Sequence, residues 1–334
     1  MAGGQERILK RRIATVQSTK KITRAMELIA GSRIVKAQHA VAAAVPYSDH
    51  ITEVVRDLGA AGGTSGSPLL TPRPEIRRVA HVVVTADRGL CGAYNSSVIR
   101  AAEGSMKEQA ELGRDYALFL VGRKAEGYFR YRNFRIDQSF TGFSDRPTYE
   151  DARKIGRAVT KAFVDGEVDM VELVYTRFIS AGSQEVVRRP LVPLEREVMA
   201  GGDGRPDENP DGTVAAAYEF EPGPDSILDA LLPRYIEARI YAALLNAAAS
   251  EHAARQRAMK SATDNAEELI KNLSRVMNRA RQDAITTEIM EIVSGAEALG
   301  KDKGSKEDIL PEFLMPEHLF KRHLDYNDPE PTHS

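Results

Sequence analysis

The longest stretch of the chain without proline or glycine places the strongest constraint on its fold. It runs from Arg234 to Ser294, 61 residues, and an α-helix of that length would extend roughly 90 Å. Pro233 precedes it and suits the first turn of a helix. A globular protein of 334 residues needs no such helix for its own core, so the stretch predicts a helix that packs against a second one.

Apolar residues along this stretch follow steps of three and four, which is the heptad pattern of a coiled coil. They are Met259, Ala262, Ala266, Leu269, Leu273, Val276 and Ala280. A similar pattern between Gln5 and Val45 consists of Leu9, Ile13, Val16, Ile22, Met26 and Ile29. Pro46 is expected to kink or interrupt this first helix before it continues to Leu58. The pattern predicts a long antiparallel coiled coil of the N- and C-terminal helices.

The middle of the chain alternates strand and helix patterns, which predicts a Rossmann-like open α/β domain with a mainly parallel sheet. The expected strands are Arg78–Ala86, Tyr116–Val121, Met170–Phe178 and Gln184–Val192, with helices after the turn DRGLCGAYN and over Thr148–Val164. The predicted division is an N-terminal helix (1–58), the α/β domain (59–232), a C-terminal helix (233–299) and a disordered tail (300–334). Within the second domain, residues 199–213 are predicted to form a mobile loop.

Composition excludes several classes of protein. The 46 Lys and Arg residues against 48 Asp and Glu give a net charge of −2, so the whole chain is not a polycation for nucleic acid. Cys91 is the only cysteine, which excludes an internal disulfide and a cysteine-cluster zinc site and fits a reducing compartment. No stretch reaches the roughly 18 consecutive apolar residues that would span a bilayer.

The turn from Asp87 to Gly92 follows a predicted strand and precedes a helix, where Rossmann folds hold phosphate. Its spacing is G-x-x-G and not G-x-G-x-x-G, so it is a weak nucleotide signal and no cofactor is predicted. Cys91 has no histidine close in sequence to activate it. His318 and His323 lack helical spacing and a third ligand, so no metal site is predicted. A nucleotide-binding oxidoreductase remains an alternative.

Both terminal helices are basic. The first carries nine Lys and Arg against Glu6 and Glu27, and the last carries seven between Arg255 and Arg281 against three acidic residues. Two basic helices side by side suggest a rod that meets acidic surfaces. A coiled coil that binds nucleic acid is the second alternative, but aromatic stacking residues are missing from both helices.

Four segments carry a resemblance to a known family. The segment Ile285–Ala298 (ITTEIMEIVSGAEA) resembles the C-terminal signature of the gamma subunit of F-type ATP synthases. Three further segments are similar to that family in the same order: Gln17–Met26 (QSTKKITRAM), Thr85–Asn95 (TADRGLCGAYN) and Ala258–Ala266 (AMKSATDNA). The resemblance covers residues 1 to about 299.

This resemblance implies an antiparallel coiled coil that carries a Rossmann-like domain and acts as the central rotor shaft of a bacterial enzyme. The implied partners are the alpha and beta subunits of the hexamer, the epsilon subunit and the c-ring, with no nucleic acid. The chain would be a non-catalytic subunit without cofactor or metal, because ATP chemistry takes place on beta. It would lie at the cytoplasmic face of the plasma membrane, peripheral to the membrane through the c-ring.

The same resemblance implies which residues contact partners. Arg281 and Gln282 match residues that hydrogen-bond an acidic loop of beta, and Thr286 and Glu288 belong to the same signature. Met26 and Arg255 match positions that face the lower lever of beta, although Met26 fits the core of the coiled coil equally well. Ile289, Ile292 and Val293 would form an apolar bearing tip.

Overall fold

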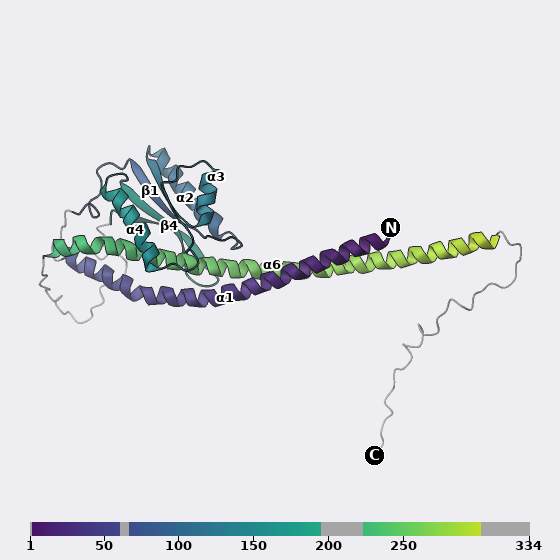
Figure 1. Ribbon diagram of the computed structural model, residues 1–334. Coiled ribbons are helices and arrows are strands. Elements are labelled where there is room, and N and C mark those ends of the chain that lie inside the picture. Colours follow the sequence, from purple (N-terminus) through teal and green to yellow (C-terminus); the bar gives the residue numbers. More distant parts are fainter. Residues whose placement is uncertain (1, 61–66, 195–222, 302–334) are drawn as a thin grey trace, which may run out of the picture. The chain divides into compact units, whose positions relative to one another are not determined.

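The computed structural model describes residues 2–60, 67–194 and 223–301. Two long helices, α1 (Ala2–Ala60) and α6 (Pro224–Lys301), enclose in sequence a domain of strands and shorter helices (Figure 1). Contacts group residues 11–273 into one compact unit, and the described residues 2–10 and 274–301 into a second. The predicted mobile loop (199–213) and the predicted tail from residue 302 onward lie outside the described residues.

A five-stranded sheet in the order β3-β2-β1-β4-β5 forms the middle domain. Its strands are β1 (Arg78–Val84), β2 (Asp115–Val121), β3 (Gln138–Phe140), β4 (Met170–Phe178) and β5 (Gln184–Val192). All neighbouring pairs are parallel except β4 and β5, which are antiparallel. The predicted open, mainly parallel sheet is confirmed.

Helices cover both faces of the sheet. α2 (Tyr94–Glu111) and α3 (Arg123–Tyr131) pack on one face, and α4 (Tyr149–Val164) packs on the other together with parts of α1 and α6 (Figure 1). Along β1, Val82 belongs to the core on the α4 side and Val83 to the core on the α2 side. Because both faces are buried, the strands are continuous apolar runs, which is why the sequence pattern revealed them.

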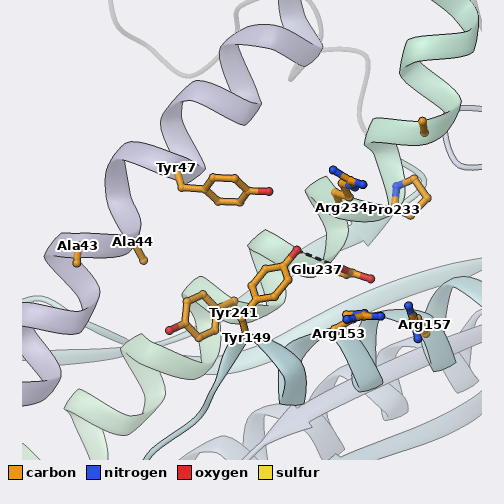
Figure 2. Close-up of a pocket in the computed structure, with 11 residues that line it drawn as sticks. Ala43, Ala44, Tyr47, Tyr149, Arg153, Arg157, Pro233, Arg234, Glu237 and Tyr241 are labelled. Atoms are coloured by element: carbon orange, nitrogen blue, oxygen red, sulfur yellow. Dashed lines mark hydrogen bonds between the residues drawn. The ribbon is translucent and has the colours of Figure 1, made fainter.

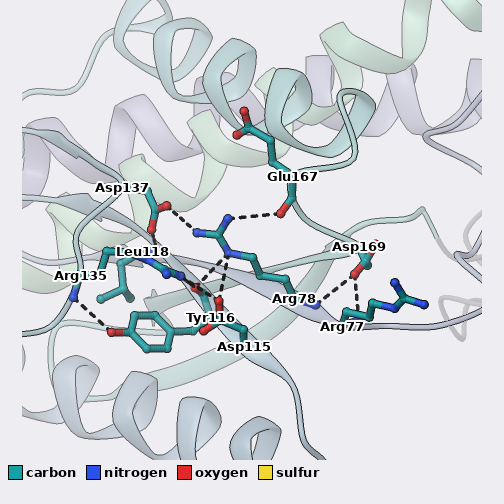
Figure 3. Close-up of polar contacts among 9 residues, drawn as sticks. All are labelled: Arg77, Arg78, Asp115, Tyr116, Leu118, Arg135, Asp137, Glu167 and Asp169. Carbon is teal, nitrogen blue, oxygen red and sulfur yellow. Dashed lines mark hydrogen bonds and ion pairs between the residues drawn. The ribbon is translucent and has the colours of Figure 1, made fainter.

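Polar bonds anchor the amino ends of the parallel strands (Figure 3). Arg78 donates from Nη2 to Asp137 Oδ1 at 2.7 Å and from Nε to the Tyr116 carbonyl at 3.2 Å. Asp169 Oδ2 accepts the backbone N–H groups of Arg77 and Arg78 at 2.8 and 3.0 Å. These bonds link β1 to β2 and to the segments that precede β3 and β4, so this end of the sheet is structural.

Two prolines lie inside helices, and one prediction about them is wrong. α6 begins at Pro224, so Pro233 is not in its first turn. Leu228, Leu232 and Ile236 lie on one face of α6 with 0% exposure, and their burial offsets the hydrogen bond that Pro233 cannot donate. α1 likewise continues through Pro46 without a break in its helical assignment.

The buried face of α1 follows a heptad that differs from the predicted one. Its buried and partly buried positions include Ile13, Val16, Lys20, Thr23, Glu27, Ala30 and Ile34. The predicted Ile22 and Ile29 are instead 58% and 55% exposed. Steps of three and four that continue from Ile13 lead to Thr23, next to Ile22, and to Ala30, next to Ile29. A polar residue and a small one carry little apolar signal, so an apolar pattern alone selects the wrong positions.

Within residues 11–273, the facing positions of α6 are Met259, Thr263, Ala266, Ile270 and Leu273. The predicted Leu269 and Val276 are exposed, and the predicted Ala262 and Ala280 are partly buried. Thr23 Oγ1 lies 2.8 Å from Thr263 Oγ1, and Lys20 Nζ lies 3.0 Å from Glu267 Oε2. Residue numbers rise along one helix as they fall along the other, so the predicted antiparallel pairing is confirmed here. These two polar pairs explain the shift of the buried face.

Candidate functional site

The turn at the carboxyl end of β1 lies where open α/β sheets bind ligands. In this chain its first residue, Asp87, holds the domain together. Its carboxylate accepts the backbone N–H groups of Gly142 at 2.9 Å, Ser144 at 3.0 Å and Arg123 at 3.1 Å. Burial alone would raise the pKa of Asp87, but these donors outweigh burial and hold the pKa below its ordinary value. The carboxylate is therefore engaged and ionised.

The other side of this turn docks on α6. Arg255 donates from Nη2 to the Gly89 carbonyl at 3.3 Å, and a Cβ added at Gly92 would lie 3.9 Å from the Ala258 Cβ. A hollow of about 400 Å³ remains beside the turn, and Arg257, the charged residue that lines it, donates to Ala181 and Gln184. Among the described residues that line this hollow, no cation is therefore free to bind phosphate, and the geometry does not support the oxidoreductase alternative.

Cys91 does not behave as a nucleophile in this turn. It is 1% exposed, and burial raises the pKa of its thiol. The Asn95 side chain donates to Cys91 Sγ at 3.1 Å. A buried thiol whose pKa is raised is predominantly protonated near pH 7, so this cysteine packs in the core.

A buried polar cluster joins α6 to α1 and to the loop before α4. Arg255 pairs with Glu251 at 2.7 Å, and Arg33 of α1 pairs with Asp145 at 2.7 Å. His252 Nε2 lies 3.2 Å from the Asp145 carbonyl. Burial raises the pKa of Glu251 and lowers the pKa of His252 to about 4. His252 is therefore neutral near pH 7 and donates its Nε2 proton to the carbonyl.

Two of the predicted contact residues, Arg255 and Met26, lie in the unit formed by residues 11–273. Arg255 is 8% exposed, and the hydrogen bonds of its guanidinium go to Glu251 and the Gly89 carbonyl. Met26 is partly buried and lies at the edge of the buried face of α1, next to Glu27. Met26 is thus neither a fully buried core residue nor a fully exposed one.

The remaining predicted residues lie near the end of α6. All are exposed, and counting 100° per residue they span roughly 160° of the helix circumference. They are Arg281, Gln282, Thr286, Glu288, Ile289, Ile292 and Val293. Between residues 277 and 299 the less exposed positions are Met277, Ala280 and Ala284, which lie within roughly 60° of one another and outside the arc of the predicted residues.

This surface, which we call the α6 outer face (Arg281, Gln282, Thr286, Glu288, Ile289, Ile292 and Val293), changes chemistry along the helix. The side chains of Arg281, Gln282, Thr286 and Glu288 make no hydrogen bond or ion pair with another described residue. Ile289, Ile292 and Val293 are 54%, 62% and 52% exposed. Unpaired polar groups and exposed apolar groups on one helix face are typical of a contact surface.

Sequence reasoning missed the residues that hold the helices to the domain. Asp145, which pairs with Arg33, lies in the loop before α4, 112 residues away. No local pattern links two such residues. The pairing of Glu251 with Arg255 could have been found, because residues four apart lie on one face of a helix.

Within the described residues, no group of three or more His, Cys, Asp or Glu side chains is arranged to hold a metal ion. His318 and His323 lie outside them. In the same part of the chain, no helix has the length and apolar character that crossing a membrane requires.

Comparison with known proteins identifies the family. A family model described as ATP synthase matches residues 5–299. The chain is 51% identical over 300 residues to the ATP synthase gamma chain of Parafrankia sp. (strain EAN1pec), with 89% of this chain and 98% of the relative covered. It is 48% identical to the gamma chain of Streptomyces coelicolor, with 89% and 97% covered. The chain belongs to the ATP synthase gamma chain family.

Solved structures show the same fold at lower identity. A chain in the cryo-EM structure of the Euglena gracilis mitochondrial ATP synthase (OSCP/F1/c-ring, rotational state 3) matches with a TM-score of 0.60 and 17% identity, over 92% of this chain and 99% of that one. A chain of the Tetrahymena thermophila central stalk and c-ring matches with a TM-score of 0.54 and 23% identity, over 72% and 99%. A gamma chain is the central rotor shaft of its ATP synthase, and it is a non-catalytic, membrane-peripheral subunit.

Proposed function

We propose that the α6 outer face is the surface through which this rotor shaft contacts the catalytic beta subunits. The observation that carries the proposal is the free state of the polar groups of Arg281, Gln282, Thr286 and Glu288. They lie on an arc of the helix that excludes Met277, Ala280 and Ala284, so a partner can reach them without disturbing these less exposed residues.

Coupling follows from differential contact. Three chemically identical beta subunits surround one shaft whose surface differs from side to side, so each beta subunit meets different groups. A shaft can shift the conformation of a beta subunit only by the difference between its contact energies with the two conformations. Rotation by the c-ring would move each contact to the next beta subunit and change its nucleotide affinity in turn. ATP chemistry takes place on beta, and this chain supplies no catalytic residue and binds no cofactor.

The predicted residues take different roles in this proposal. Arg281 and Gln282 donate hydrogen bonds to an acidic loop of beta, where a guanidinium binds a carboxylate well. The apolar tip rotates against an apolar surface of the hexamer that surrounds it. It consists of Ile289, Ile292 and Val293, and few directional bonds have to break there at each step. Met26 faces the lower lever of beta from the edge of the coiled coil. Because Arg255 is buried, it acts on that lever by positioning α6 against the turn at Gly89.

The proposed partners are the alpha and beta subunits of the hexamer, the epsilon subunit and the c-ring. The chain then lies at the cytoplasmic face of the plasma membrane and reaches the membrane through the c-ring. A nucleic-acid-binding role is disfavoured, because Lys20, Arg24 and Arg33 of the basic first helix are engaged in ion pairs within the chain.

The experiment is replacement of Arg281 and Gln282 by alanine in the assembled complex. Each lost charge-assisted bond is worth roughly 1.5–3 kcal/mol, so we expect slower turnover of ATP hydrolysis with unchanged subunit composition. The matched control is Glu291→Gln, an exposed charged residue on the side of Met277, Ala280 and Ala284. Normal turnover in the double variant, or an equal loss in the control, would contradict the assignment.

A further inference from the structure

A cavity of about 860 Å³ lies between three helices in the unit formed by residues 11–273 (Figure 2). α1 contributes residues 43–47, α4 its first three turns, and α6 residues between 230 and 241. The lining residues used below are Tyr47, Tyr149, Arg153, Arg157, Arg234 and Glu237. Its volume falls in the range of cavities that hold small molecules.

Three guanidinium groups line this cavity. Arg153 and Arg157 lie one turn apart on α4, and Figure 2 shows Glu237 between them and Arg234 of α6. Arg153 pairs with Glu150 at 3.0 Å, but both side chains are 40% or more exposed, so that pair is weak. Arg157 and Arg234 form no ion pair with any described residue. Two of the three cations are therefore free to bind an anion.

One carboxylate lies at the floor of the cavity and is already engaged. Glu237 is 9% exposed and accepts a hydrogen bond from Tyr149 Oη at 3.0 Å. Its Cγ packs against Gly156, where an added Cβ would come within 2.9 Å. Burial and the bond to Glu237 raise the pKa of Tyr149 well above its ordinary value, so this tyrosine remains a neutral donor. With Arg153 paired to Glu150, Arg157 and Arg234 against the Glu237 carboxylate leave the cavity with one positive charge in excess.

Aromatic rings form the remaining wall. Tyr47 is 50% exposed and its ring is drawn beside that of Tyr149 in Figure 2. Tyr149 and Tyr241 pack edge to face, with ring centroids 5.7 Å apart. A wall of this kind can contact the organic part of a ligand, while the guanidinium groups bind its charge.

We propose that this cavity binds a phosphate-bearing ligand. Two or three converging arginines match the charge and the several acceptor oxygens of a phosphate or diphosphate better than those of a single carboxylate. A bound phosphate would link α4 and α6 through Arg157 and Arg234, and an organic group would reach Tyr47 of α1. The site is separate from the α6 outer face, so this inference stands or falls independently of the proposed function.

The test uses the full-length chain and isothermal titration with pyrophosphate, ADP and inorganic phosphate. We expect saturable binding of pyrophosphate or ADP. We expect the double variant Arg157→Gln/Arg234→Gln to weaken that binding by about tenfold or more. The matched control is Lys154→Gln/Lys161→Gln, which removes two charges from α4 outside the cavity lining. Control affinity should stay within about twofold of the parent protein.

Vesicles distinguish the source of the phosphate. If vesicles of phosphatidic acid and phosphatidylcholine bind through Arg157 and Arg234 while the soluble probes do not, the ligand is a lipid headgroup. If the soluble probes bind, it is a free phosphate compound. All substituted residues lie on the surface side of helices, and circular dichroism checks that each variant folds. The inference is overturned if no probe binds, or if both double variants lose affinity equally.

Discussion

The hydrogen bonds among three buried polar side chains of the α/β domain distinguish a structural role from a catalytic one. Ser105, His81 and Glu172 are residue types that hydrolases combine, and all three are buried. Yet Ser105 donates to Glu172 and not to His81, whose Nδ1 lies 3.1 Å from the same carboxylate. Hydrogen bonds from His81 and Ser105 outweigh burial and hold the pKa of Glu172 below its ordinary value. Because Ser105 is 0% exposed, its hydroxyl is not placed to act as a nucleophile. The three residues have a structural role between the sheet and α2.

Also at the scale of the residue, the lowered pKa of His252 predicts that the stability of the chain depends on pH. Its pKa is about 4 in the folded chain against an ordinary 6.5, so between these values the unfolded chain binds a proton that the folded chain does not. Stability therefore falls as the pH is lowered through this window, by roughly 2–3 kcal/mol. His252→Gln keeps a donor for the Asp145 carbonyl and should lose that part of the dependence in thermal melts from pH 7 to 4.

Other charged groups face His252, and they set the control. Glu251, Arg255, Arg33 and Asp145 surround it, and the raised pKa of Glu251 acts in the opposite direction, because it favours the folded state as the pH falls. The comparison is therefore the difference between the two melting curves and not either curve alone. Identical curves for the parent protein and His252→Gln would contradict the prediction.

Gly122 predicts a backbone effect at one residue. Its φ is +91°, and an added Cβ would lie 2.2 Å from the Thr85 carbonyl oxygen. Gly122→Ala should lower the free energy of unfolding by about 3 kcal/mol or more in urea titrations. Gly127→Ala, in α3 with nothing within 4 Å of the added Cβ, should raise it by about 0.5–1 kcal/mol. A tolerated Gly122→Ala would mean that the turn relaxes.

At the scale of elements, sequence patterns succeeded for strands bounded by turn residues, whether buried throughout like β4 or half-exposed like β5. The strands over Met170–Phe178 and Gln184–Val192 were predicted to the residue, because β-branched runs end at clear turn residues. β3, with three residues, is too short to produce a pattern. The start of α6 was missed, because Pro233 is a helix-start signal that buried leucines override.

The candidate sites were predictable to different degrees. The residues of the α6 outer face came from a resemblance, and the structure adds that they share one exposed side of the helix. The arginine-lined cavity was not predictable, because its lining comes from three helices between Tyr47 and Tyr241. The buried face of α1 was misplaced, because Thr23 and Glu27 are polar residues that carry no apolar signal.

The corrected face of α1 makes a prediction about the element. Ile34 is 4% exposed and Ile29 is 55% exposed, so one isoleucine is buried and the other faces out. Ile34→Ala should destabilise residues 11–273 by about 2–4 kcal/mol, because it removes buried methyl groups and leaves a cavity. Ile29→Ala should change stability by less than about 1 kcal/mol in the same urea titration. If Ile29→Ala proved more destabilising than Ile34→Ala, the heptad expected from the apolar residues would be the correct one.

At the scale of the whole molecule, the chain combines a Rossmann-like domain with the long α6 helix of a rotor shaft. In the Rossmann-like domain, Arg255 holds the turn that follows β1 on α6. Its sheet therefore anchors helices and binds no dinucleotide there. What this chain transmits between its partners is a mechanical change, and that requires α6 to remain a continuous helix.

The last prediction tests this continuity at Leu273, which lies on the buried face of α6 and is 8% exposed. Leu273→Pro removes a backbone donor and should cost about 3 kcal/mol or more while it kinks the helix. Leu273→Ala removes the same packing but keeps the backbone bonds, so it is the matched control. In inverted membrane vesicles with assembled complex, we expect the proline variant to hydrolyse ATP with much less proton pumping per ATP, and the alanine variant to keep the normal ratio. Equal pumping ratios in the two variants would mean that rotation tolerates a broken helix, and that transmission does not depend on the rigidity of α6.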